Sequence, residues 1–183
     1  FLGTHDTPRI LTVLGADRIP ESKEERAIYR LSPAQRQRGL ELVRLAALVL
    51  FTFPGSPTVY YGDEIGLEGW EDPFNRGTYS WESGDRELLA YFQRLGALRR
   101  SCPPLREGSI QWLYTSGPLL IFARELEKSR LITVLNASDQ ERELPLSEPK
   151  VRNLLTGAVL SPEDGRLRLP PRTGLLLTED CPG

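Results

Sequence analysis

The amino-acid pattern of this chain changes character near residue 107, and that change limits the folds available to it. Before this point, long segments repeat apolar residues at helical spacing, and after it short alternating segments are separated by turn-forming residues. At 183 residues the chain is long enough for one or two domains, each with a core of its own. We therefore predict two parts, residues 1–106 and residues 107–183.

Residues 1–106 carry three helical patterns and two strand-like segments. The clearest helix start is Ser32, because Pro33 and Gln35 follow it in the spacing of a capping box. That helix becomes increasingly apolar toward Phe51, and the Pro54 turn ends it. We predict strands at 1–3 and 58–61, further helices at 8–14 and 85–100, and mostly loop over 15–31. A strand, a long helix and a second strand in this order predict a parallel sheet covered by helices.

Residues 107–183 alternate apolar and polar positions in short runs. Turn formers such as Ser116-Gly117-Pro118 and Asp164-Gly165 separate the runs. The predicted strands are 109–115, 119–125, 131–136, 142–146, 151–155, 166–169 and 174–178. This spacing predicts a small antiparallel β-sandwich, so the fold class is α/β followed by all-β.

Composition argues against several kinds of partner. Lys and Arg total 23 against 25 Asp and Glu, a net charge of −2, which gives no reason to expect a nucleic acid as main partner. The longest apolar run, 45–51, is about a third of a bilayer span, so no membrane partner is expected. Cys102 and Cys181 match no metal-ligand spacing, and we expect no metal and no cofactor. Whether the two cysteines pair stays open.

The start of the chain suggests an internal or C-terminal piece of a longer protein. The 183-residue sequence contains no Met, and it opens on Phe1-Leu2-Gly3 without a leader. A targeting signal would lie upstream of this piece, so the presence of a signal peptide stays open; the expected location is cytoplasmic.

Residues suited to chemistry follow both predicted strands of the first part. The connection 62–81 is rich in Gly, Asp, Glu and aromatic residues and is too long to be a passive link. It begins at a strand end, where α/β folds place their active sites. His5-Asp6 follows the other strand. One interpretation is that Asp6 or Thr7 only caps the next helix; the other is that the carboxylate and imidazole bind vicinal sugar hydroxyls.

The blocks around these residues resemble a known family. Phe1-Leu2-Gly3-Thr4-His5-Asp6 resembles the Phe-x-x-x-His-Asp block of the α-amylase superfamily (glycoside hydrolase family 13), and it is similar to the neopullulanase, cyclomaltodextrinase and maltogenic amylase branch. Residues 53–66 resemble the segment around the eighth barrel strand, and 72–76 resemble that branch's Asp-Pro-x-x-Arg loop. The resemblance implies that residues 1–106 form the last two strands and helices of a (β/α)8 barrel and that 107–183 form the C-terminal β-domain.

The resemblance also assigns roles to single residues. Asp6 matches the family's third essential carboxylate, which bonds the 2- and 3-hydroxyls of the sugar at subsite −1, and His5 matches the histidine beside it. Asp72 and Arg76 match a pair that holds the sugar at subsite −2, although a salt bridge that only braces the loop is the alternative. Asp63 and Glu64 match a structural stretch, and we expect both to support the loop.

Two residues that the retaining mechanism requires do not fall within the resemblance. The family's nucleophile and its general acid/base lie on earlier barrel strands, upstream of the His-Asp block. We therefore expect the isolated chain to be inactive, and its partners to be α-glucan oligosaccharides and the N-terminal part of the same enzyme. The oligomeric state stays open. The alternatives are a non-catalytic α-glucan-binding or scaffold module and an enzymatically silent relative that keeps the fold for interaction.

Overall fold

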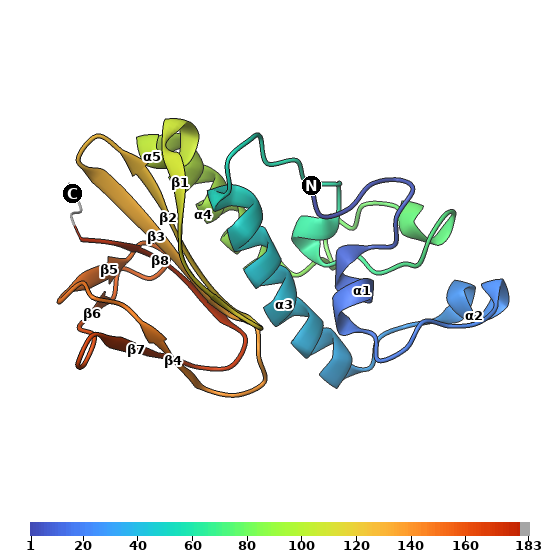
Figure 1. The fold of residues 1–183 in the computed structure, drawn as a ribbon. Coiled ribbons are helices and arrows are strands. Elements are labelled where there is room, and N and C mark those ends of the chain that lie inside the picture. Colours follow the sequence, from blue (N-terminus) through green and yellow to red (C-terminus); the bar gives the residue numbers. More distant parts are fainter. Residues whose placement is uncertain (180–183) are drawn as a thin grey trace. The chain divides into compact units, whose positions relative to one another are not determined.

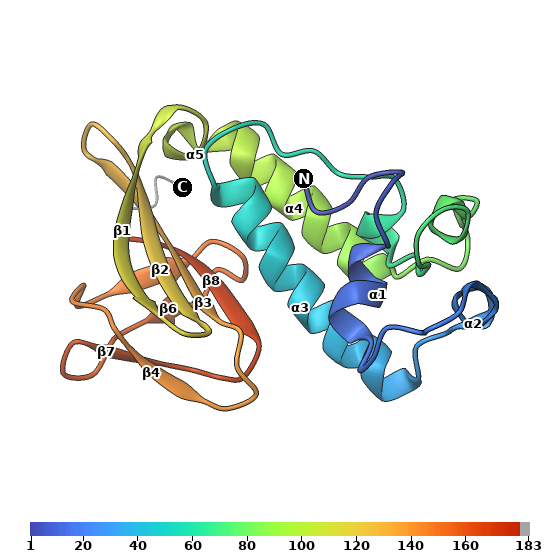
Figure 2. The same cartoon turned by 45° about the vertical axis from the view of Figure 1, so that its right-hand side comes forward.

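The computed structural model describes residues 1–179, which divide into two compact units (Figures 1 and 2). The first unit comprises Phe1–Leu50 and Pro57–Gln93, and the second comprises Phe51–Ser56 and Arg94–Gly183. Helices α3 (Pro33–Thr52) and α4 (Arg86–Ser101) contribute residues to both units.

The first unit is helical with long connections. Its other elements are helices α1 (Ile10–Gly15) and α2 (Lys23–Ile28) and the short 3₁₀ turns η1 (Asp63–Ile65) and η2 (Phe74–Arg76). Gly39 of α3 lies against α1, since a Cβ there would stand 2.8 Å from the Leu11 side chain and 3.0 Å from the Gly15 Cα. The glycine therefore lets α1 pack directly on α3 (Figure 2).

The capping box that begins α3 is confirmed. The Ser32 N–H donates to Gln35 Oε1 at 2.9 Å, and the Gln35 N–H donates back to Ser32 Oγ at 3.3 Å. Helix α2 was not predicted, although Ser22 caps it by accepting a hydrogen bond from the Glu25 N–H at 3.1 Å. The prediction of loop over 15–31 is wrong at that helix because a single polar turn leaves no apolar periodicity to detect.

The two strands predicted in the first part are not formed. Residues 1–3 and 58–61 are irregular, and every strand pairing among the described residues is antiparallel and lies beyond residue 108. A strand is held by hydrogen bonds to a neighbouring strand, and residues 1–106 contain no strand to serve as one. The predicted parallel sheet is therefore not present among residues 1–179.

The second unit contains two antiparallel sheets around one core. The larger sheet has the order β1-β2-β3-β8-β5-β6, and the smaller pairs β4 with β7. Ile121, Ile132 and Leu177 of the larger sheet share a buried cluster with Leu144 and Leu169 of the smaller one. The elements are α5 (Pro103–Glu107), β1 (Ser109–Ser116), β2 (Leu119–Leu126), β3 (Ser129–Asn136), β4 (Arg142–Pro145), β5 (Val151–Asn153), β6 (Val159–Leu160), β7 (Arg166–Leu169) and β8 (Thr173–Thr178). All seven predicted strands are present, and among the strands formed by residues 1–179 only the short β6 was missed.

Buried polar side chains fix the loops of this unit. The Asn136 amide donates to the carbonyls of Gln140, Leu169 and Pro170, at 2.8, 3.0 and 2.9 Å. The guanidinium of Arg124, 1% exposed, donates to Thr52 O at 2.8 Å and to Gly108 O. The buried Asn136 amide and Arg124 guanidinium therefore both find backbone acceptors, as burial requires.

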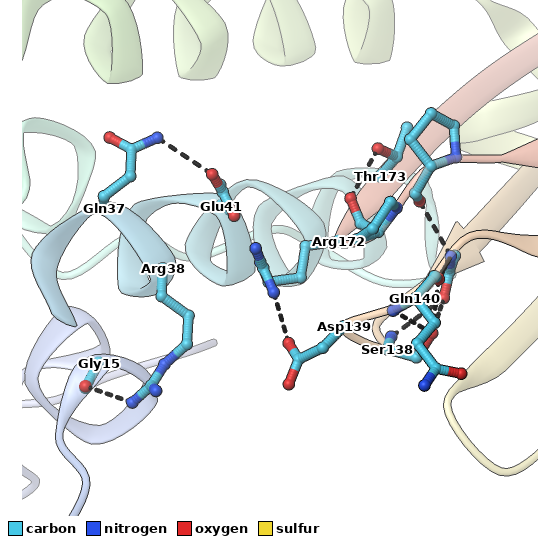
Figure 3. A network of polar contacts seen from close by, with 12 residues as sticks. Gly15, Gln37, Arg38, Glu41, Ser138, Asp139, Gln140, Arg172 and Thr173 are labelled. Carbon is cyan, nitrogen blue, oxygen red and sulfur yellow. Dashed lines mark hydrogen bonds and ion pairs between the residues drawn. The ribbon is translucent and has the colours of Figure 1, made fainter. Parts of the chain in front are cut away.

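Ion pairs and side-chain hydrogen bonds occur on the surface of both units, and Figure 3 shows examples from each. In the second unit Ser138 donates to Gln140 O at 2.9 Å, and Arg172 pairs with Asp139. In the first unit Arg38 donates to Gly15 O at 2.8 Å. None of the helices formed by residues 1–179 combines the length and apolar character that a membrane crossing requires.

Candidate active site

The structure brings the four predicted site residues together on the surface of the first unit. His5 Nε2 lies 3.2 Å from one oxygen of the Asp6 carboxylate, and Arg76 Nη2 lies 3.9 Å from the other. Arg76 Nε also pairs with Asp72 Oδ1 at 3.0 Å. Because all four side chains are substantially exposed, the result is an open row of imidazole, carboxylate, guanidinium and carboxylate.

Asp6 does not cap the following helix. Helix α1 begins at Ile10, its N-cap is Arg9, and no side chain caps it. Thr7 Oγ1 instead accepts a bond from the Thr4 N–H at 2.9 Å, within the turn that carries His5 and Asp6. The capping interpretation is therefore wrong, and the Asp6 carboxylate points to charged neighbours instead of a helix end.

The pairing of Asp72 with Arg76 has the i,i+4 spacing that a loop brace would use. However, Arg76 also approaches Asp6, which is far away in the sequence. The Arg76 side chain is 45% exposed, and a planar guanidinium carries five N–H donors, which suits it to sugar hydroxyls as well as to bracing. The geometry thus leaves both roles available to this pair.

The loop that carries Asp72 and Arg76 is fastened to the His5-Asp6 turn. The side-chain amide of Asn75 donates to His5 O at 2.8 Å and to Thr7 O at 2.7 Å. The Arg9 N–H donates to Gly69 O at 2.8 Å, and the Gly69 N–H donates to Thr12 Oγ1 at 2.8 Å. These bonds fix the position of the Asp72–Arg76 loop relative to the His5-Asp6 turn.

A buried ion pair that sequence reasoning missed joins the start of α1 to η1. Arg9 Nη1 contacts Asp63 Oδ1 at 3.1 Å and donates to Tyr61 O, and both charged side chains are almost fully buried. The Arg9 guanidinium lies 4.2 Å from the centre of the Tyr60 ring and 4.7 Å from that of Tyr61. Burial raises the pKa of Asp63 to about 6 despite the opposing effect of Arg9.

Asp63 and Glu64 serve the loop, as expected. Asp63 ties η1 to Arg9 at the start of α1, and Glu64 Oε2 accepts a hydrogen bond from the Gly62 N–H at 2.8 Å. Nothing in the local sequence marks Arg9 as buried. The sequence signal near its partner is the run Tyr60-Tyr61-Gly62-Asp63-Glu64, in which an acidic pair follows two tyrosines after one glycine.

No group of three or more His, Cys, Asp or Glu side chains among residues 1–179 is arranged to hold a metal ion. Cys102 forms no disulfide with any of residues 1–179. Cys181 lies outside the described residues, so the pairing of the two cysteines is not tested.

Comparisons with known proteins connect this site to one family. A family model described as the alpha-amylase catalytic domain matches residues 1–91. An amylopullulanase from Thermoanaerobacter thermohydrosulfuricus is 35% identical over 126 residues, 69% of this chain and 8% of the relative. A cyclomaltodextrinase from Geobacillus thermopakistaniensis is 33% identical over 181 residues, 93% of this chain and 27% of the relative.

Solved structures agree with the sequence relatives. An α-amylase from Anoxybacillus matches with a TM-score of 0.72 and 31% identity, over 82% of this chain and 35% of that one. The chain spans about a third or less of the length of each of these three relatives.

Proposed function

Since this chain belongs to the α-amylase superfamily, whose members similar to it are α-glucan hydrolases, we propose that it is the C-terminal part of a retaining enzyme of this kind. The enzyme cleaves α-glycosidic bonds in maltooligosaccharides, cyclodextrins or pullulan. The observation that carries the proposal is the cluster of His5, Asp6, Asp72 and Arg76, which lies within the segment matched by the family's catalytic-domain model.

In this proposal the four residues bind and orient the sugar. Asp6, with His5 beside it, accepts hydrogen bonds from the 2- and 3-hydroxyls at subsite −1. These bonds strengthen as the ring flattens toward an oxocarbenium-like transition state. Arg76, oriented by Asp72, holds the next sugar at subsite −2. Its contact with Asp6 supports the assignment, because neighbouring sugars need neighbouring binding groups.

The bond-breaking carboxylates of the proposed enzyme lie outside this chain. A retaining glycosidase needs a nucleophile and a general acid/base about 5–5.5 Å apart. We propose that the N-terminal part of the same enzyme supplies both and completes the barrel around residues 1–106. Incubating the full-length protein with maltotriose, pullulan and β-cyclodextrin and measuring reducing ends tests the proposal. If no reducing ends are released from any of the three substrates, the proposal is overturned and a glucan-binding module is favoured.

We also propose that residues 107–183 form a β-domain that folds without the preceding part. Its core is drawn from its own two sheets, which supports this. Expressed alone, Glu107–Gly183 is expected to give a β-type circular dichroism spectrum and dispersed amide resonances. It keeps Gly108 O as an acceptor for Arg124 but loses Thr52 O.

The matched control for this experiment is Leu177→Asp in the same piece. Leu177 is fully buried in the shared core, so a charge there should abolish the dispersion. A helical or random-coil spectrum from the unaltered piece would contradict an independent domain.

Replacing Arg76 by Ala in the full-length enzyme should mainly affect long substrates. Arg76 has no proton-transfer role in the proposal, so it acts through binding energy remote from the scissile bond. We expect kcat/KM to fall by about tenfold or more on substrates that fill subsite −2. For substrates that fill subsite −1 but not subsite −2, kcat/KM should change much less. The measurement is kcat/KM along a maltooligosaccharide series.

Two further variants sharpen this test. Arg76→Lys should not restore full activity, because an ammonium lacks the planar fork of donors. Arg38→Ala removes another surface arginine of the same unit, paired with Asp17, and should leave the series unchanged. An equal loss of kcat/KM on short and long substrates after Arg76→Ala would show that the Asp72–Arg76 pair only braces the loop.

A further inference from the structure

We propose that Asn75 is a positioning residue that sets the place of the Asp6 carboxylate relative to Arg76. The inference rests on the proposed function and extends it to a residue that contacts neither sugar. It is drawn from the two hydrogen bonds that the Asn75 amide makes to the turn around Asp6.

Both hydrogens of the Asn75 amide are committed to that turn. One bonds His5 O, in the peptide plane that enters Asp6, and the other bonds Thr7 O, one residue beyond Asp6. The two carbonyls therefore lie on either side of the Asp6 Cα. Asn75 is fully buried, with 0% of its surface exposed, so water does not compete for these acceptors.

The turn has weaker supports of its own. The Asp6 N–H donates to Thr4 Oγ1 at 3.1 Å, and the Thr7 N–H donates to Thr4 O at 3.3 Å. Both bonds are exposed or local, and neither reaches the loop that carries Arg76. The Asn75 amide thus hydrogen-bonds the backbone of the Asp6 turn to the Asp72–Arg76 loop, beside the 3.9 Å ion pair between the Arg76 and Asp6 side chains.

Asn75 also stands next to Arg76 in the sequence, inside η2, where the Arg76 N–H donates to Pro73 O at 3.2 Å. A shift of Asn75 therefore moves Arg76 as well as the Asp6 turn. One residue fixes the distance between the groups assigned to subsites −1 and −2. Because small displacements of a positioned group cost up to about a hundredfold in rate, loss of this bridge should affect turnover itself.

The expected signature differs from that of a residue that serves Arg76 alone. In the proposed function such a residue would act like Arg76→Ala and lower activity on long substrates. A residue that places Asp6 lowers kcat on all substrates, including those with one sugar on that side. Measuring kcat and KM separately on substrates of different length therefore distinguishes the two roles.

The test is Asn75→Asp in the full-length enzyme. The side chain keeps its size, but a carboxyl donates at most one hydrogen, and only when it is protonated, so at least one of the two carbonyl oxygens loses its donor. We expect kcat per folded enzyme to fall by about ten- to a hundredfold on short and long maltooligosaccharides alike. Folded enzyme is measured by near-ultraviolet circular dichroism.

The matched control is Gly77→Ala, two residues along the same loop, where a Cβ meets no atom within 4 Å. It should retain wild-type kcat. If Asn75→Asp does not fold, Asn75→Ser decides, because its hydroxyl can serve one of the two carbonyls and should give an intermediate loss.

Three results would count against the inference. Wild-type kcat in a folded Asn75→Asp enzyme, or in Asn75→Ser when the Asp variant does not fold, overturns it. A loss confined to long substrates also overturns it, in favour of a residue that positions Arg76 alone. If the wild-type enzyme hydrolyses no α-glucan, the proposed function fails and the inference fails with it.

Discussion

Replacing Asp6 by Asn in the full-length enzyme should lower kcat by about a hundredfold or more while changing KM far less. The substitution keeps the size of the side chain but removes the charge that strengthens hydrogen bonds to the flattening sugar. Loss of two charge-assisted bonds, each about 1.5–3 kcal/mol, accounts for an effect of this size. Because these bonds matter most in the transition state, the loss falls on kcat.

The structure predicts that this variant folds normally. The Asp6 side chain is 72% exposed, and its partners are the exposed His5 and Arg76. Surface pairs of this kind contribute little to stability. Asp17→Asn is the matched control, since Asp17 is another exposed carboxylate of the same unit with a guanidinium partner. A fall in kcat below tenfold for Asp6→Asn would show that Asp6 does not stabilise the transition state.

The 183-residue chain alone should hydrolyse no α-glucan. In the proposed function Asp6 stabilises charge on a sugar that other carboxylates attack and protonate, so without them there is no reaction for it to assist. The purified chain is incubated with maltotriose, pullulan and β-cyclodextrin, and reducing ends are followed over time. The full-length enzyme at the same concentration is the positive control.

The informative comparison for that experiment is the chain carrying Asp6→Asn. Turnover above the blank that disappears in the variant would contradict the expectation and place a complete catalytic set within residues 1–183. Turnover that persists in the variant would indicate a contaminating glycosidase.

Sequence reasoning succeeded where structure is decided within a few residues. The spacing of Ser32 and Gln35 predicts the two hydrogen bonds between them. The alternation from Ser109 onward predicts strands that pair with the next strand along the chain. It failed where an element depends on distant partners. Residues 1–3 and 58–61 have strand-like composition, but composition supplies no neighbouring strand.

The candidate site shows the same division. His5 and Asp6 are neighbours in sequence, and Asp72 and Arg76 are four apart, so each pair could be proposed from spacing. The approach of Arg76 to Asp6, the Asn75 bridge and the buried Arg9–Asp63 pair join segments more than fifty residues apart. Such contacts are set by the packing of the whole unit, which no local pattern encodes.

The chain contains three asparagines, and their placement bears on how the protein ages chemically. Deamidation begins when the backbone nitrogen of the next residue attacks the side-chain amide carbon and expels ammonia. Asn75, Asn136 and Asn153 are all buried. The nitrogen that follows each one is already bonded to a carbonyl: Arg76 to Pro73, Ala137 to Pro118 and Leu154 to Leu176.

Each attacking nitrogen would have to leave its hydrogen bond, and each amide would have to rotate within packed surroundings. Asparagine is a thermolabile residue that proteins working at high temperature tend to avoid. Here the same bonds that shape the loops keep the three amides from reacting. For Asn75 this protection is most useful, because deamidation would convert the donor beside Asp6 into a carboxylate.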